Sequence, residues 1–189
     1  FHGYGNEIGS FYGDDPEYIA LMAATETLAY ENVPGFGAHS KHFIARGGRN
    51  SYSAAKSPAD LIDSWKIGWQ AVVDAGTSYV MTNNSIGVTP GLTTFMDPDT
   101  FSILRDELGY DGVICLDWPM DASRIMSQTG VTQDGFDVST LTTLGERYAW
   151  ILDVGIDMFS CSTVLAGTDI NAYAETKGHV EGGYFPDAL

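Results

Sequence analysis

The chain is poor in the residues that build disulfide frameworks and metal sites. Only two of its 189 residues are cysteines, Cys115 and Cys161, which is too few for a framework and not in a metal-type spacing. None of the HExxH, EF-hand, Walker A, GxGxxG or GxSxG patterns occurs, and the pair Gly47 and Gly48 lacks the rest of a phosphate loop. The sequence therefore predicts no metal, no cofactor and no serine nucleophile.

Positive charge is also scarce. Nine Lys and Arg residues stand against 25 Asp and Glu, for a formal net charge of −16. Such a field repels phosphate backbones and anionic membrane surfaces, so we expect neither nucleic acid nor a membrane as partner. No apolar run approaches the length of a membrane span, and no signal peptide is recognisable. A neutral substrate fits this composition best.

What the chain does contain is a regular alternation of strand and helix patterns, with 44% hydrophobic residues to build a core. Asp15 and Pro16 mark a helix start, with Asp at the N-cap and Pro at the first helical position. Four strands are predicted, at 39–44, 78–82, 113–116 and 155–159. Helices are predicted at 16–31, from 58, from 98 to about 108, at about 138–153 and at 169–180. This rhythm is typical of an α/β domain with parallel strands.

Four strand–helix repeats are half of a closed barrel, which needs roughly 250 residues. The chain is therefore either a small open doubly wound sheet or part of a larger barrel. The predicted loops that follow strands are long, and those that follow helices are short. This asymmetry favours a barrel with its functional site on one rim.

The strand that ends at Asp117 carries the clearest chemical signal. An apolar run from Val113 to Leu116 stops at a carboxylate followed by an indole, Asp117 and Trp118. Asp117 either caps the next helix or serves chemistry at the open edge of the sheet. Because side chains alternate along a strand, Val113 and Cys115 share its face, and Ile114 and Leu116 pack outward on helices. A carboxylate beside a flat apolar ring suits sugar chemistry.

Lys41 and His42 end the first predicted strand, where they either form a solvated loop or donate hydrogen bonds to vicinal hydroxyls. Trp65 and Trp69 differ from them. Their spacing of four residues on a predicted helix indicates packing rather than function.

Several segments together resemble glycoside hydrolase family 3. Residues 104–118 resemble its nucleophile segment L-R-x-E-L-G-F-D-G-V-V-V-S-D-W, and residues 41–43 match its sugar-binding K-H-F motif. Further matches are Val80–Thr82 to the V-M-x-S-Y strand with Ala75 and Gly76 before it, Gly155–Met158 to the A-G-x-D-M strand, and Gly13–Pro16 to the G/S-E-D-P helix start. All of these fall in family order.

The resemblance implies a partial (β/α)8 TIM-type barrel of about four parallel strands, each followed by a helix, and a retaining exo-β-glycosidase. By position, Asp117 would be the nucleophile, Trp118 would line the sugar subsite, and Lys41 and His42 would bind hydroxyls of the terminal sugar. Asn84 stands where the family has a substrate-contacting tyrosine, and the family's G-R-N/C-x-E arginine has no clear match here. The glycines after K-H-F resemble the exo-glucanase-like branch.

The family's acid/base is usually a glutamate on a second domain. Neither Asp121 nor Glu7 is a convincing substitute. We therefore expect residues 1–189 to be part of one barrel domain, with earlier strands and a second domain as partners, and the chain to be inactive alone. The expected substrate is a neutral oligosaccharide or glycoside with terminal β-linked glucose. A β-xylosidase and an inactive sugar-binding or scaffold module are the alternatives. The composition favours a secreted or periplasmic enzyme and leaves a cytoplasmic one open.

Overall fold

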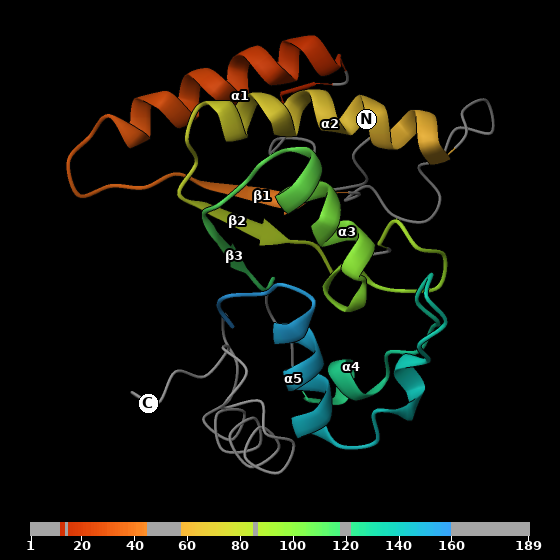
Figure 1. The fold of residues 1–189 in the computed structure, drawn as a ribbon. Helices are drawn as coiled ribbons and strands as arrows, with labels where there is room; N and C mark the ends of the chain where they lie inside the picture. The colour runs from red at the N-terminus through yellow and green to blue at the C-terminus, as the bar shows by residue number, and fades with distance from the viewer. Residues whose placement is uncertain (1–11, 14, 45–57, 85–86, 118–121, 160–189) are drawn as a thin grey trace.

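The computed structural model describes residues 12–13, 15–44, 58–84, 87–117 and 122–159. Its α-helices and strands, in chain order, are α1 (Pro16–Glu31), β1 (His39–Phe43), α2 (Pro58–Asp74), β2 (Tyr79–Thr82), α3 (Pro98–Ser102), β3 (Val113–Cys115), α4 (Ala122–Met126) and α5 (Leu144–Asp153). In Figure 1, α1 and α2 lie side by side on one side of the sheet, and α4 and α5 lie beyond its other end. No helix in the described ranges combines the length and apolar character needed to cross a membrane.

The sheet has three parallel strands in the order β1-β2-β3. Its pairing is regular from His39↔Tyr79 to Lys41↔Met81, and the register then shifts so that Phe43 pairs with Thr82. This irregularity leaves His42 between two paired residues, at the end of the ladder. The parallel α/β arrangement predicted from the sequence is confirmed.

The fourth predicted strand, 155–159, is wrong as a full strand. Only Met158 forms a bridge, parallel to Cys115. The physical reason lies at Ile114, whose main-chain N–H donates to the Asp157 carboxylate at 2.7 Å. A side chain thus takes a donor that a continuous ladder would pair with a carbonyl. The backbone still runs alongside β3, because Leu116 N donates to Met158 O at 2.9 Å.

The first helix forms where its capping residues predict it. The Asp15 carboxylate accepts from the main-chain N–H groups of Glu17 at 2.9 Å and Tyr18 at 3.1 Å, and Pro16 occupies the first turn. These contacts satisfy donors that the helix itself leaves unpaired. Both predicted ends, Pro16 and Glu31, are confirmed.

Two of the later helix predictions and one loop prediction need correction. The helix predicted over 98–108 is α-helical only to Ser102 and continues as a π-helical turn, Ile103–Glu107, which still buries Leu104 and Leu108. The helix predicted from 138 begins at Leu144, because Thr143 and Glu146 form a capping box there. The segment predicted as a long loop after Asp117 contains the short helix α4. The helix predicted at 169–180 lies outside the described residues.

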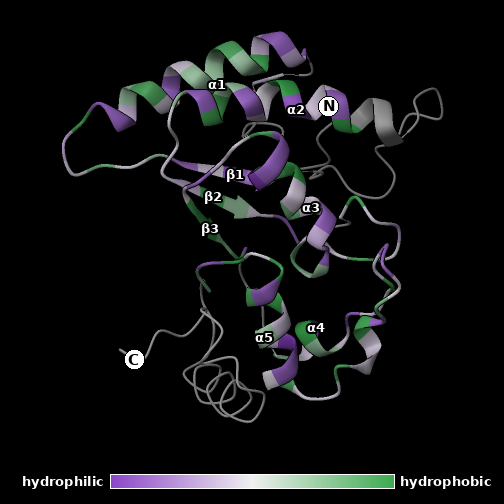
Figure 2. Ribbon diagram, in the orientation of Figure 1, coloured by the Kyte–Doolittle hydropathy of each residue, from purple (hydrophilic) through white to green (hydrophobic). Residues whose placement is uncertain are grey.

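The core packs the sheet against helices α3 and α5. Ile114 and Leu116 are fully buried in one apolar cluster with Phe101 and Leu104 of the α3 region and Ile151 of α5. The outward packing predicted for Ile114 and Leu116 is thus confirmed. In Figure 2 hydrophobic colour is strongest along β3, with further patches on the helices.

The tryptophans of α2 belong to packing, as predicted. Trp65 and Trp69 are partly buried against the core, and the Trp69 ring meets the Phe43 ring edge-on at a centroid distance of 5.0 Å. Aromatic pairs prefer this geometry.

Glu31 joins the end of α1 to the sheet. Its carboxylate accepts from the main-chain N–H of Ala38 at 2.8 Å, and from Ser78 N at 2.7 Å and Ser78 Oγ at 2.9 Å. The hydrogen bond from Ala38, with those from Ser78, holds the pKa of the Glu31 carboxyl below its ordinary 4.5, against a smaller opposing effect of burial.

We expect Glu31→Gln to lower the free energy of unfolding near pH 7 by about 1 kcal/mol, because the amide replaces one accepting oxygen by a donor. A carboxyl whose pKa is lowered on folding stabilises above its ordinary pKa, and that stability is lost as the pH falls through the folded value. The gap between wild type and variant in urea titrations should therefore close as the pH falls below 4.5. A gap that stays constant from pH 7 to pH 3 would contradict this role.

Candidate functional site

Polar side chains gather where the three parallel strands end. His42 lies at the end of β1, Thr82 and Asn83 at the end of β2, and Asp117 two residues beyond β3. Because the strands are parallel, these ends meet at one edge of the sheet (Figure 1). This is the edge at which α/β folds carry their sites.

His42 and Asp117 form the centre of this edge. The His42 Nε2 atom lies 3.7 Å from Asp117 Oδ1, with side-chain exposures of 14% and 7%. The two groups attract each other when the ring is protonated. The sequence singled out these two residues for different tasks. The fold brings them into contact from strands on either side of β2.

The main chain of Asp117 is held by a side chain that sequence reasoning missed. The Asp117 N–H donates to Thr82 Oγ1 at 3.3 Å. Thr82 is fully buried, as are Asn83 and Thr94. Asn83 N donates to Phe43 O at 2.9 Å, and the Thr94 hydroxyl donates to Asn83 Oδ1 at 2.9 Å. Polar contacts thus tie the three strand ends together where the ladder stops.

We expect Thr82→Val to lower the free energy of unfolding by about 1–3 kcal/mol, because the buried Asp117 N–H loses its acceptor inside the protein. Thr82→Ser keeps the hydroxyl and should retain most of the stability. Equal midpoints for Thr82→Val and wild type in urea denaturation would show that this hydrogen bond does not hold Asp117.

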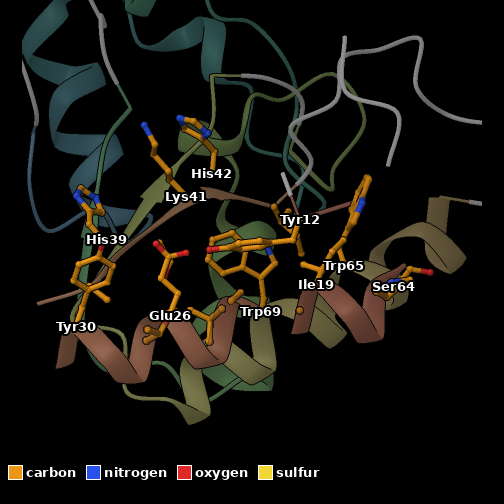
Figure 3. Close-up of a pocket in the computed structure, with 18 residues that line it drawn as sticks. Tyr12, Ile19, Glu26, Tyr30, His39, Lys41, His42, Ser64, Trp65 and Trp69 are labelled. Atoms are coloured by element: carbon orange, nitrogen blue, oxygen red, sulfur yellow. The ribbon is translucent and has the colours of Figure 1, made fainter. Parts of the chain in front are cut away.

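Lys41 lies apart from the pair of His42 and Asp117. It is exposed, and Figure 3 shows its side chain and that of His42 extending from β1 on the side away from α1. Among the described residues, Lys41 forms no ion pair with Asp117.

Asn84 follows the end of β2 and contacts the helix after Asp117. Its main-chain carbonyl accepts from Arg124 Nη2 of α4 at 3.4 Å. Its side-chain Oδ1 is buried and has no hydrogen-bond partner among the described residues. Trp118, the predicted sugar platform, lies outside the described residues, as do Asp121 and Glu7.

Arg147 of α5 holds α4 and the residues after it by hydrogen bonds. The sequence did not indicate this role. It is 4% exposed. Its guanidinium donates to the carbonyls of Leu141 at 2.8 Å, Ile125 at 3.0 Å and Gln128 at 2.7 Å. Burial lowers the pKa of this guanidinium. Carbonyls at the end of α4 are a favourable partner for a cation, because the helix dipole is negative there.

A cavity of about 310 Å³ lies on the other side of β1, between that strand and helices α1 and α2. Lys41 and His42 reach its wall, but Asp117 does not line it. In Figure 3 the Trp69 side chain lies between β1 and α1. The cavity therefore adjoins the strand ends around Asp117, and His42 belongs to both.

No group of three His, Cys, Asp or Glu side chains that could hold a metal ion occurs in the part of the chain that the structure describes.

Comparison with known proteins identifies the fold. No family model matches the chain, and no curated protein matches it. Solved structures do match. A fungal multi-domain glycoside hydrolase family 3 β-N-acetylglucosaminidase with a GCN5-related glucosamine N-acetyltransferase region aligns over 93% of this chain and 21% of its own, with a TM-score of 0.65 and 20% identity.

Two bacterial enzymes align similarly. A β-glucosidase from Listeria innocua, solved in complex with isofagomine, covers 93% of this chain with a TM-score of 0.70 and 20% identity. A β-N-acetylhexosaminidase from Beutenbergia cavernae covers 91% with a TM-score of 0.62 and 20% identity. This chain spans 24% and 50% of those proteins.

The chain shares the fold of these glycosidase regions. The resemblance to glycoside hydrolase family 3 drawn from the motifs is thereby confirmed at the level of the fold. The chain spans between about a fifth and a half of the structures that it matches.

Proposed function

We propose that this chain carries the nucleophile of a retaining exo-β-glycosidase that releases terminal β-linked glucose from oligosaccharides or glycosides. The observation that carries the proposal is the contact between His42 and Asp117, 3.7 Å apart at the carboxyl edge of a parallel sheet. The fold shared with solved glycosidases supports it.

In the proposed reaction a carboxylate oxygen of Asp117 attacks the anomeric carbon, and the bond to the leaving-group oxygen breaks. A separate acid gives that oxygen a proton. Water then attacks the glycosyl ester, loses its proton to the same group and releases the sugar with retained configuration. His42 and Lys41 bind hydroxyls of the terminal sugar, and Trp118 and Asn84 line its subsite.

His42 has a second task in this scheme, because it faces the nucleophile. An imidazolium beside Asp117 keeps the carboxylate ionised in the resting enzyme. When the ester forms, that charge is lost and the ring is released to hold a sugar hydroxyl.

The acid/base comes from polypeptide beyond these 189 residues. Retaining enzymes place their two carboxyl groups about 5–5.5 Å apart, and the resemblance to glycoside hydrolase family 3 implies that the acid/base is a glutamate on a second domain. We therefore propose that the chain is part of a (β/α)8-type barrel, with further barrel strands and a second domain completing the enzyme. That the chain spans at most half of its structural matches supports this.

We expect the 189-residue chain alone to show no turnover of an aryl β-glucoside, and the product of the complete reading frame to turn it over. The aryl β-glucoside and the aryl β-xyloside should be compared side by side. Faster release of xylose would change the proposed activity from β-glucosidase to β-xylosidase. Turnover by the chain alone would refute the proposal that the acid/base lies outside these 189 residues.

Two observations favour a second candidate, a sugar-binding module without catalysis. Asp117 is 5% exposed, and Asn84 stands in place of the family's tyrosine. Isothermal titration calorimetry with glucose separates the two candidates when combined with the activity assay. Binding by the complete protein without any turnover would favour the module.

A further inference from the structure

The loop between β2 and α3 begins at the edge of the sheet where the strands end. Its first residue, Asn83, is fully buried, and the Asn83 main-chain N–H donates to Phe43 O of β1 at 2.9 Å. The far end of the loop returns to the same place, because the Thr94 hydroxyl donates to Asn83 Oδ1 at 2.9 Å. The path of this loop therefore sets the position of Asn83 and of Asn84, which follows it in the chain.

A fully buried carboxylate, that of Asp97, holds the loop together. Its Oδ2 atom accepts from the Thr89 N–H at 2.9 Å and from the Thr100 hydroxyl at 2.7 Å. Its Oδ1 atom accepts from the Asp99 N–H at 3.3 Å. The Thr100 hydroxyl also accepts from the Val88 N–H at 3.1 Å. Two successive main-chain groups of the loop are thus held on one carboxylate, one directly and one through Thr100.

The loop packs closely around this carboxylate. Gly87 is buried, and a Cβ atom at this position would lie 2.8 Å from the Asp97 Cβ atom, too close for two side chains. The Gly87 N–H donates to Leu92 O at 2.8 Å, which ties the two arms of the loop to each other. A glycine is needed here because the loop backbone lies directly against Asp97.

Capping a helix does not by itself require such an arrangement. Asp15 caps α1 and, like Asp97, is followed by a proline in the first turn. Asp15 is exposed, and within the described ranges it accepts from N–H groups of its own helix, those of Glu17 and Tyr18. Burying a carboxylate is unfavourable unless donors replace its water. Asp97 is buried, and its additional donors hold the loop.

We propose that Asp97 is a positioning residue for the sugar subsite. Its carboxylate fixes the loop at residues 88–89, and the Asp97 N–H donates to Thr94 O at 3.3 Å in the short 3-10 turn that precedes it. Through Thr94 and Asn83 this arrangement holds Asn84 where it lines the subsite. The proposal rests on the proposed function for the identity of the ligand, a terminal glucose, and adds a residue that controls its affinity.

The loop acts on sugar binding rather than on the nucleophile. The contacts of Asp117 to His42 and to Thr82 come from the ends of β1 and β2 and do not involve residues 87–97. A displaced loop therefore misplaces Asn84 and leaves the carboxylate of Asp117 near His42. Small displacements of a group that contacts a ligand have large effects on binding.

Thr100→Val in the complete protein is the most selective variant. Valine has nearly the shape of threonine but lacks the hydroxyl, so it breaks the link from Asp97 to the Val88 N–H and keeps the hydrogen bond from Asp99 to Asp97. We expect the Kd of glucose, measured by calorimetry, and the KM for an aryl β-glucoside each to rise about tenfold, and kcat to change less than about twofold. Thr100→Ser keeps the hydroxyl and should restore both values.

Two further variants separate the loop from the helix cap. Asp97→Asn should raise the Kd and KM as Thr100→Val does. Asp15→Asn makes the same change at the other Asp-Pro cap, and it should leave the Kd and KM unchanged. Unchanged values in Thr100→Val, an equal rise in Asp15→Asn, or a loss of kcat with KM unchanged would each overturn the proposal.

Amide hydrogen exchange without sugar distinguishes failure of this proposal from failure of the proposed function. The Asn83 amide should exchange at least about tenfold faster in Thr100→Val than in wild type, and at the wild-type rate in Thr100→Ser. An unchanged rate in Thr100→Val would overturn the positioning by Asp97, whether or not the protein cleaves glycosides. A wild-type protein that neither binds glucose nor cleaves glycosides would overturn the proposed function and, with it, the assignment of a sugar subsite.

Discussion

Asp117→Asn is expected to reduce kcat for an aryl β-glucoside at least about a thousandfold in the complete enzyme, roughly 4 kcal/mol of barrier. The amide has nearly the same shape as the carboxylate but cannot form the glycosyl ester. Glucose binding, measured by calorimetry, should persist, because the sugar hydroxyls are held by other residues.

Asp111→Asn is the matched control for that variant. Asp111 precedes β3 and is exposed, at the opposite end of the strand from Asp117. Its amide variant should retain wild-type kcat. Full activity in Asp117→Asn, or an equal loss in both variants, would remove Asp117 from the chemistry.

Arg147→Met is expected to give the largest loss of stability among the substitutions considered. It removes a donor from three carbonyls, those of Leu141, Ile125 and Gln128, and Ile125 O keeps the main-chain N–H of Gln128 at 3.3 Å. Each buried polar group left unpaired costs about 1–3 kcal/mol, so the free energy of unfolding should fall by about 2 kcal/mol or more. Urea denaturation followed by circular dichroism measures this.

Arg124→Met provides the comparison on α4. Arg124 is exposed, and its guanidinium donates to Asn84 O at 3.4 Å, so the substitution should cost well under 1 kcal/mol. Arg147→Lys should fall between the two, because an ammonium cannot reach three separate carbonyls as a planar guanidinium does. Equal urea midpoints for Arg147→Met and Arg124→Met would contradict a stabilising role for the hydrogen bonds of Arg147.

The ends of helices were predicted best where the residues that determine them act within one turn. Asp15 and Pro16 set the start of α1 because the cap and the ring act on the first turn alone. The start of α5 carried a similar signal in Thr143 and Glu146, a capping box that outweighs the helical pattern upstream. The strands predicted at 39–44, 78–82 and 113–116 match β1, β2 and β3 within one residue at either end.

Elements that depend on distant contacts could not be predicted in this way. The π-helical turn at 103–107 has the same apolar spacing as a regular helix, so periodicity does not reveal it. The fourth strand failed because the Asp157 carboxylate takes the Ile114 N–H, a pairing between residues that the sequence does not connect.

The sequence predicted which residues form the site, but it did not predict which of them contact one another. Asp117 and His42 stand out because a charged residue at the end of a strand is poorly placed for packing. Their approach to 3.7 Å depends on the strand order. Thr82 and Arg147 escaped notice because their partners are main-chain groups, which leave no mark in the sequence.

The burial of Asp117 gives the proposal its sharpest constraint. Asp117 is 5% exposed, and the His42 side chain beside it is 14% exposed, so a substrate must fit into the small accessible area that these two side chains leave. A buried carboxylate is also less hydrated, and this raises the reactivity of its oxygen toward an electrophilic carbon.

The most direct test of the central claim is covalent trapping with 2,4-dinitrophenyl 2-deoxy-2-fluoro-β-glucoside. Its leaving group departs without a proton, so the external acid is not required for the first step. The account predicts an adduct of one fluoroglucosyl group, located by peptide mass spectrometry on Asp117 and absent from Asp117→Asn. A label on any other carboxylate, or an adduct that survives in Asp117→Asn, would contradict it.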